Sequence, residues 1–219
     1  EGTLGFITAV TLKLFPVPRS TATAWLAVTS PDNAVAMLGK ARQKLGDDLV
    51  AFELIPRVAV EMVVHNIPGR RDPLPAPHEW YVLLELANAR DAAETESLLT
   101  AFLANCMDTD ELSDGVVATS EAQRKQFWSV RHDISEAQKV AGASIKHDIS
   151  VPVSAIPDFL ERADKLVNDV LPGIRPVAFG HLGDGNLHYN LSPPEAMSDD
   201  EFIALWPELN ELVHTLAVE

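Results

Sequence analysis

Cysteine is almost absent from this sequence, since Cys106 is the only one among 219 residues. A single cysteine excludes an internal disulfide, and chains without disulfides are typical of a reducing compartment. Cys106 falls within an apolar pattern of helical spacing, where a thiol usually acts as a small core side chain. The chain is 47% apolar, which suffices for a sizeable core. We therefore predict a cytoplasmic protein that folds without covalent cross-links.

Basic residues are scarce relative to acidic ones. Seventeen Lys and Arg face 32 Asp and Glu, which gives a formal charge of −15. This field repels phosphate backbones and anionic membrane surfaces, so a nucleic-acid partner is excluded. It also repels anionic small molecules, so a site for one needs its own Arg, Lys or metal ion. No apolar run approaches the roughly 20 residues of a membrane-spanning helix.

Several catalytic and nucleotide-binding motifs are also missing. The sequence has no glycine fingerprint of a dinucleotide fold and no P-loop lysine, and Gly183-x-Gly185 lacks a third glycine. It has no Gly-x-Ser-x-Gly elbow, no Cys with a placed His and no His-Glu-x-x-His helix. Hydrolase chemistry therefore has little support.

Apolar spacing predicts both strands and helices along the chain. The expected strands cover residues 6–15, 21–29, 49–54, 80–87, 116–119 and 145–151, and a hairpin covers 177–191. The expected helices cover residues 30–45, 57–65, 91–106, 120–140 and 154–170, and a last helix starts at Ser198. A loop is expected at 67–77, where four prolines and a glycine interrupt regular structure. Because these elements intermingle without regular βαβ alternation, we predict an α+β fold, in which helices cover an antiparallel β-sheet.

The hairpin carries two histidines. If residues 183–186 form its turn, Leu182 pairs with Leu187 and His181 lies opposite His188. Directly opposed residues have Cβ atoms about 4.5–5.5 Å apart, a separation from which two imidazoles can converge on one metal ion. Two histidines are only half of a metal site. A hairpin with a tight Asp-Gly turn and two incidental histidines fits the same spacing.

The expected helix over 120–140 carries a candidate anion site. Arg131 and Ser135 are four residues apart, so they project the same way. An arginine can grip a carboxylate through two parallel hydrogen bonds, and a serine hydroxyl can add a third. An ordinary surface ion pair with Glu121, Asp133 or Glu136 is the alternative.

The expected strand over 145–151 adds another cation. Lys146 shares a face with Asp148, whereas His147 points to the other side. Lys146 is therefore a second candidate anion contact, and a cross-strand salt bridge is the alternative.

Several motifs follow one another in the order and approximate spacing of one known family. They are the segment 1–8, Trp128-Ser129-Val130-Arg131 with Ser135, Lys146-His147-Asp148-Ile149-Ser150-Val151-Pro152, and the segment 180–188. With this ordered set, the chain resembles the C-terminal half of the FAD-linked oxidases of the vanillyl-alcohol oxidase type. Within that family it resembles in particular the D-lactate, glycolate and D-2-hydroxyglutarate dehydrogenases.

The resemblance implies a fragment of a larger flavoprotein. Residues 1–18 would close the FAD-binding domain and connect it to residues 19–219, a ferredoxin-like substrate and metal domain that is truncated at its C-terminus. The resemblance assigns substrate binding to Arg131, Ser135 and Lys146, a zinc or manganese ion to His181 and His188, and FAD contacts to Gly2, Thr3, Gly5 and Asn186. The third metal ligand and the catalytic base are expected downstream of Glu219, so no catalytic base is assigned within this chain.

The resemblance also implies an activity, namely the oxidation of a small D-2-hydroxy acid to the 2-oxo acid by hydride transfer to FAD, with a metal assisting. The implied partners are the 2-hydroxy acid, the missing FAD-binding domain and, as an option, a second copy in a homodimer. The electron acceptor stays open. A non-redox flavin enzyme of the alkyl-glycerone-phosphate synthase type and a catalytically silent binding subunit are the alternatives. The isolated fragment is expected to be inactive.

Overall fold

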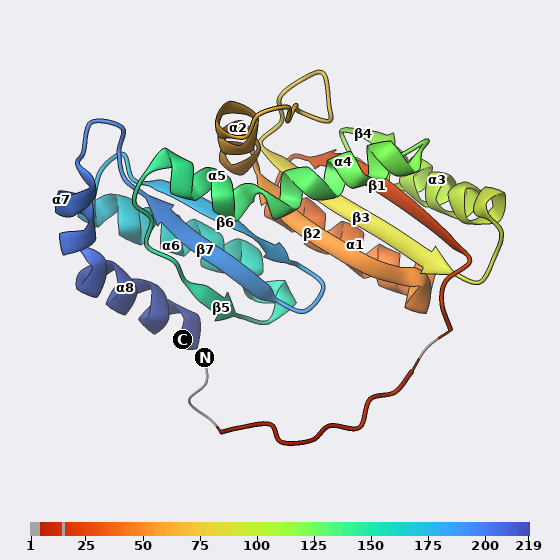
Figure 1. Ribbon diagram of the computed structural model, residues 1–219, viewed down its shortest axis with the longest axis horizontal. Helices are drawn as coiled ribbons and strands as arrows, with labels where there is room; N and C mark the ends of the chain where they lie inside the picture. The colour runs from red at the N-terminus through yellow and green to blue at the C-terminus, as the bar shows by residue number, and fades with distance from the viewer. Residues whose placement is uncertain (1–4, 15) are drawn as a thin grey trace.

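A seven-stranded antiparallel sheet forms the centre of the molecule (Figure 1). The computed structural model describes residues 5–14 and 16–219. The strand order is β4-β1-β3-β2-β6-β7-β5, so strands distant in sequence become neighbours. The strands are β1 (Ser20–Val28), β2 (Leu49–Pro56), β3 (Trp80–Asn88), β4 (Asp114–Val117), β5 (Asp148–Ser150), β6 (Arg175–His181) and β7 (Asn186–Ser192). The predicted α+β class, an antiparallel sheet covered by helices, is confirmed.

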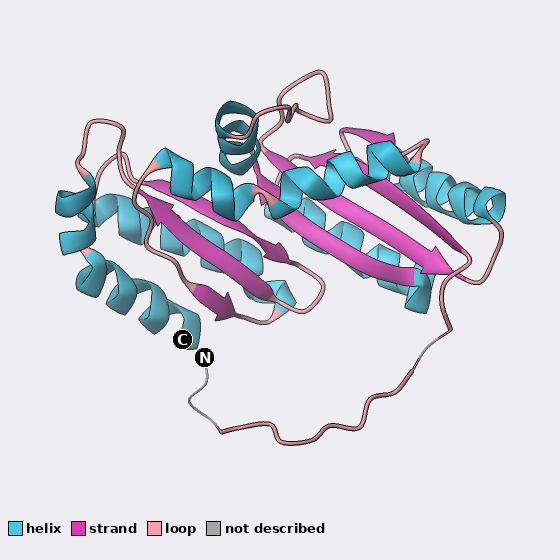
Figure 2. Cartoon of the chain, viewed as in Figure 1, coloured by secondary structure: helices cyan, strands magenta, loops and turns pink. Residues whose placement is uncertain are grey.

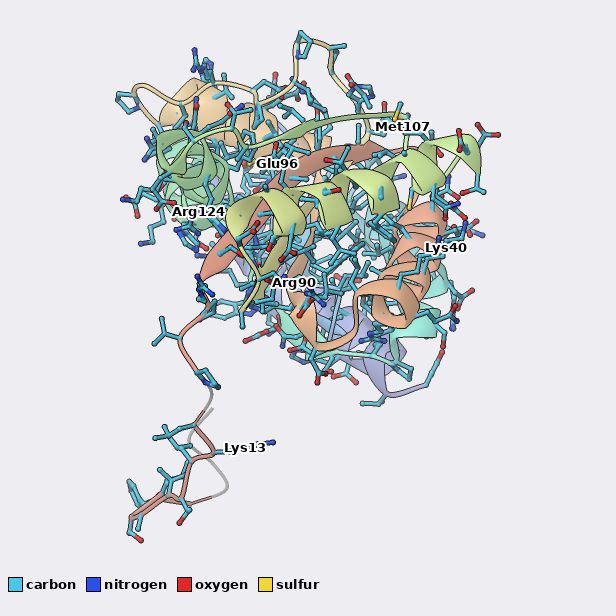
Figure 3. The ribbon with its side chains drawn as sticks, turned by 90° about the vertical axis from the view of Figure 1, so that its right-hand side faces the viewer. Lys13, Lys40, Arg90, Glu96, Met107 and Arg124 are labelled. Carbon is cyan, nitrogen blue, oxygen red and sulfur yellow. The ribbon has the colours of Figure 1, made fainter. Side chains whose placement is uncertain are left out.

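Helices pack on both faces of the sheet (Figure 2). On one face α1 (Pro31–Leu45), α3 (Ala92–Asp108), α6 (Ile156–Val170), α7 (Asp199–Ala204) and α8 (Trp206–Val218) build the larger core. On the other face α2 (Arg57–Asn66), α4 (Glu121–His132) and α5 (Ile134–Ala141) build a smaller one around Trp25, Tyr81 and Phe127. In the end view of Figure 3, Lys40 of α1 and Arg124 of α4 lie on opposite sides of the molecule. Among the described residues, no helix combines the length and apolar character that a membrane crossing requires.

Local capping explains where several helices begin. The side chains of Ser30, Asp91, Ser120 and Ser198 each accept a hydrogen bond from a backbone N–H in the first turn of the helix that follows. Such caps satisfy one of the four N–H groups that a helix start leaves without a partner. The helices predicted to begin at these residues are confirmed, and so is the loop at 67–77.

Three sequence predictions are wrong or too long. The strand predicted over 6–15 is absent from the described residues 6–14, where Phe6 and Leu14 are 100% and 88% exposed. An alternating segment becomes a strand only where a neighbouring strand supplies hydrogen bonds. The strand predicted over 145–151 shrinks to β5, preceded by an isolated bridge between Ile145 and Leu191.

The helix predicted over 120–140 divides into α4 and α5 at Asp133. The Asp133 carboxylate accepts a hydrogen bond from Arg70 Nε at 2.5 Å, and Arg70 belongs to the loop that follows α2. This contact joins residues 63 positions apart, so the apolar spacing of the helix carries no sign of it.

Candidate functional site

One end of the sheet face under α4 and α5 is polar. Along β6, the buried Val177 and Phe179 are followed on the same face by His181, whose side chain is 53% exposed. The same change occurs along β2, where Ile55 belongs to the smaller core and Glu53 comes two residues before it. Since alternate residues of a strand share a face, these polar side chains gather where the covering helices end. The candidate site lies at this end.

The histidine hairpin has a different register from the predicted one. In the structure His181 pairs with Asn186, and Phe179 pairs with His188. The turn is therefore 182–185 instead of 183–186, and the predicted direct opposition of His181 and His188 is wrong. Because the register differs by an even number of residues, both histidines still share one face. They are diagonal neighbours, a relation that typically separates Cα atoms by about 7–8 Å.

The last residue of the turn, Gly185, occupies a position that favours glycine. Its φ is +81°, a left-handed conformation that glycine adopts without strain. Its Cα also approaches the Val151 carbonyl oxygen so closely that a Cβ would collide with it. Asp184 completes the turn, since its Oδ1 accepts a hydrogen bond from the Asn186 backbone N–H at 3.0 Å.

The two glycines of the turn are expected to respond differently to alanine. Gly185→Ala should lower the free energy of unfolding by about 1–3 kcal/mol, because the backbone must leave its φ and move away from Val151. Gly183→Ala is the matched control: no atom lies within 4 Å of its Cβ position, so a change within about 0.5 kcal/mol is expected. Urea unfolding of both variants measures the difference, and equal losses would contradict the role given to Gly185.

Glu53 connects two of the predicted site residues. Its side chain is buried, and its Oε2 accepts a hydrogen bond from Arg131 Nε at 2.8 Å and forms an ion pair with Arg131 Nη2 at 2.8 Å. Its Oε1 lies 2.5 Å from His181 Nδ1. Arg131 therefore forms none of the surface ion pairs considered as alternatives; it is itself buried and stacks 4.8 Å from the centre of the Phe179 ring.

His188 lies at the centre of the polar end. Its ring is 5.0 Å from the Phe179 ring between centroids, and its Nδ1 is 3.6 Å from Asp148 Oδ1. Asn186 donates a hydrogen bond to the same Asp148 oxygen at 3.1 Å. Burial lowers the pKa of His188, and the nearby charge of Arg131 lowers it further, although Asp148 raises it. This shift favours neutral imidazole, the form that binds metal ions.

The remaining two substrate-binding candidates are exposed. The pairs Ile145–Leu191 and Asp148–His188 place Lys146 opposite Asn190, on the face that carries His188. Across the described part of the chain, Lys146 forms no ion pair, so the predicted alternative of a cross-strand salt bridge is not formed. Ser135 lies on α5, beyond the break at Asp133, and makes no hydrogen bond to the other candidates within the described residues.

Comparison with known proteins decides the family. Residues 17–217 match the family model described as "FAD linked oxidases, C-terminal domain". The chain belongs to this family. A D-2-hydroxyglutarate dehydrogenase of Xanthomonas citri pv. viticola is 37% identical over 97% of this chain and 44% of its own length. One from Stutzerimonas stutzeri is 36% identical over 97% of this chain and 45% of its own length.

The fold is also shared with more distant enzymes. p-Cresol methylhydroxylase with substrate bound superposes with a TM-score of 0.60 at 8% sequence identity, over 92% of this chain and 43% of that one. At this identity the likeness shows the fold alone. The chain spans less than half the length of the relatives and of this neighbour.

The FAD-linked oxidase resemblance assigned four residues to the cofactor. Gly2 and Thr3 lie outside the described residues. Gly5 is exposed, and it belongs to no helix or strand. Asn186 lies at the polar end, directly opposite His181 across the hairpin. Of the two that the structure describes, Asn186 is the one that lies next to the histidines and Asp148.

The two histidines fit the implied metal. Nδ1 of His181 faces Glu53 and Nδ1 of His188 faces Asp148. Histidine ligands usually bind the metal through one ring nitrogen and donate the other N–H to a carboxylate or carbonyl, and here Nε2 of both rings is left for the metal. Within the described residues, no cluster of three or more His, Cys, Asp or Glu side chains has the arrangement of a metal site. A metal site would need at least one further ligand beside these two histidines.

Glu53 was missed by reasoning from sequence, although β2 contains a signal for it. The strand reads Leu-Val-Ala-Phe-Glu-Leu-Ile-Pro, with one acidic residue in an otherwise apolar run. A charge in such a run is buried, and buried charges require a partner. The pattern shows that a partner must exist, but not that it is Arg131, which lies 78 residues away.

Proposed function

We propose that this chain is the substrate- and metal-binding domain of an FAD-dependent dehydrogenase that oxidises a D-2-hydroxy acid to the 2-oxo acid. The observation that carries the proposal is the meeting of Arg131, His181 and His188 at one polar end of the sheet. D-2-hydroxyglutarate is the substrate we favour over D-lactate and glycolate. Its second carboxylate needs a second cation, and the exposed Lys146 on the same face supplies one.

The proposed domain division follows the sequence prediction. Residues 1–18 would complete the FAD-binding domain, and residues 19–219 would form the substrate domain. The exposure of Phe6, Leu14 and Val17 supports this division, since apolar side chains of this size are usually covered by a partner. The catalytic base and the third metal ligand would follow Glu219. A cytoplasmic location and a homodimer complete the proposal.

Each side chain has a separate task in the proposed reaction. Arg131 binds the 2-carboxylate through the N–H groups that Glu53 does not engage, while Lys146 and Ser135 hold the distal end. This fixes which face of C2 is presented. His181 and His188 would hold zinc or manganese, and Asn186 would lie beside the flavin or the substrate. When bound, the metal would lower the pKa of the 2-hydroxyl group, and the flavin would supply the acceptor for the hydride.

Reduction of a dye acceptor tests this function. The full-length protein should reduce the dye with D-2-hydroxyglutarate, more slowly with D-lactate or glycolate, and not with the L-acids. Extended treatment with a chelator should lower the rate, and added zinc or manganese should restore it. If no 2-hydroxy acid reduces the protein, the proposed dehydrogenase activity is wrong. If the rate survives complete metal removal, only the metal-binding role of His181 and His188 is wrong, and the dehydrogenase activity stands.

A further inference from the structure

Glu53 occupies a position that the proposed reaction does not yet explain. It lies on β2, a central strand of the sheet, and its side chain is only 3% exposed. Each of its two oxygens has a different partner: Oε2 binds Arg131 and Oε1 binds His181. One carboxylate thus contacts the proposed anion-binding residue and one proposed metal ligand.

The contact with His181 fixes where the imidazole carries its proton. A carboxylate only accepts hydrogen bonds, so His181 Nδ1, at 2.5 Å from Oε1, must be the N–H donor. The neutral ring then has its lone pair on Nε2, which lies on the opposite side of the ring from Glu53. A metal ion needs this lone pair.

The contact with Arg131 fixes one edge of the guanidinium. Nε and Nη2 both point to Oε2 at 2.8 Å, which directs Nη1 away from Glu53. The carboxylate also offsets the charge of Arg131, a buried cation whose field acts on His188. Without that compensation, the cation would oppose a second positive charge bound at the histidines.

We propose that Glu53 is a positioning residue that holds His181 in its metal-binding tautomer and Arg131 in its anion-binding orientation at the same time. This inference rests on the proposed function. It assigns one buried carboxylate to both halves of the site, so that metal binding depends on a residue that does not touch the metal.

Glu85 provides a matched comparison on the next strand. It lies on the same sheet face, and its Oε2 accepts hydrogen bonds from Arg124 Nη1 at 3.1 Å and Trp128 Nε1 at 2.7 Å, both on α4, and from Thr23 Oγ1 of β1 at 2.7 Å. Arg124 and Arg131 are two turns apart on α4, so both glutamates fasten this helix to the sheet. Only Glu53 also contacts a histidine of the hairpin. Replacement of Glu85 therefore disturbs the contact between α4 and the sheet without removing a contact of the histidine hairpin.

The experiment compares Glu53→Gln and Glu85→Gln in the full-length protein. The glutamine that replaces Glu53 should turn its carbonyl to Arg131 and its NH₂ to His181, which moves the imidazole proton to Nε2. Zinc and manganese affinity, measured by competition with a chelator, should then fall by about 10–100-fold. Nitrogen-15 NMR of labelled histidine in the metal-free protein should show the change of tautomer. Glu85→Gln should leave both measurements as in the unmodified protein.

Two outcomes would overturn the proposal: an unchanged His181 tautomer in Glu53→Gln, or an equal loss of metal affinity in Glu85→Gln. If the unmodified protein binds no metal, the proposed metal role of the histidines is wrong. The NMR measurement of the His181 tautomer in the metal-free protein then still tests the positioning role of Glu53. If Glu53→Gln does not fold, Arg131→Met/Glu53→Leu replaces the buried pair with apolar side chains, a change that proteins often tolerate. That double variant should still bind metal about tenfold more weakly than Arg131→Met alone.

Discussion

Arg131→Met in the full-length protein is expected to lower kcat/KM for the D-2-hydroxy acid by about 10²–10³-fold. Truncating one partner of a buried, hydrogen-bonded charge pair typically costs about 2–5 kcal/mol. Arg131 is 8% exposed and already held by Glu53, so its orientation is set before an anion arrives. The loss should therefore appear in both KM and kcat, because the guanidinium both binds the carboxylate and orients C2. Steady-state kinetics with a dye acceptor measures both.

Two further variants separate binding from folding. Arg131→Lys keeps the charge but not the planar fork, so it should recover only a small part of the lost rate. Arg124→Met removes the other arginine that fastens α4 to the sheet, through Glu85, and should change kcat/KM by no more than about twofold. Equal losses in Arg124→Met and Arg131→Met would show that the position of α4 matters and that Arg131 is not an anion-binding residue.

The sequence predicts most of the fold because most elements carry a local signal. β1 and β3 are buried central strands bounded by turn residues, and α1 and α3 begin at side chains that cap them. The wrong predictions, for the helix over 120–140 and the strand over 6–15, have a common cause. The break between α4 and α5 coincides with an ion pair to Arg70, and the segment 6–14 has no neighbouring strand within the described residues. Both depend on contacts between distant parts of the chain, which periodicity does not contain.

The sequence predicts which residues belong to the candidate site better than it predicts how they are arranged. His181, His188 and Arg131 are named from the sequence, and the structure brings them together. Their arrangement could not be predicted, because the hairpin turn packs at Gly185 against Val151, a contact 34 residues apart in sequence. The link between Arg131 and His181 passes through Glu53 on β2, which no motif marks. Ser135 was expected beside Arg131, but the break at Asp133 separates the two helices that carry them.

His188→Ala is expected to remove the bound metal and lower kcat by about 10²–10³-fold in the full-length protein. A metal that polarises the substrate oxygen contributes several kcal/mol to the transition state, and two histidines cannot share an ion when one is gone. Chelation of the unmodified protein should produce the same loss, and chelation of the variant should produce none beyond it. Metal content by elemental analysis, together with kcat, measures the effect.

His65→Ala is the control, since His65 is exposed on α2 and lies outside the polar end. It should keep both metal and rate. The experiment also separates metal binding from packing, because the His188 ring lies against the Phe179 ring at a tilt of 42°, and Phe179 also packs against Arg131. His188→Phe preserves an aromatic ring at that position but supplies no ligand nitrogen. If His188→Phe keeps the metal and the rate while His188→Ala loses rate alone, the histidine serves packing and the hairpin pair is incidental. If both variants lose metal and rate together, the ring nitrogen of His188 is what the site requires.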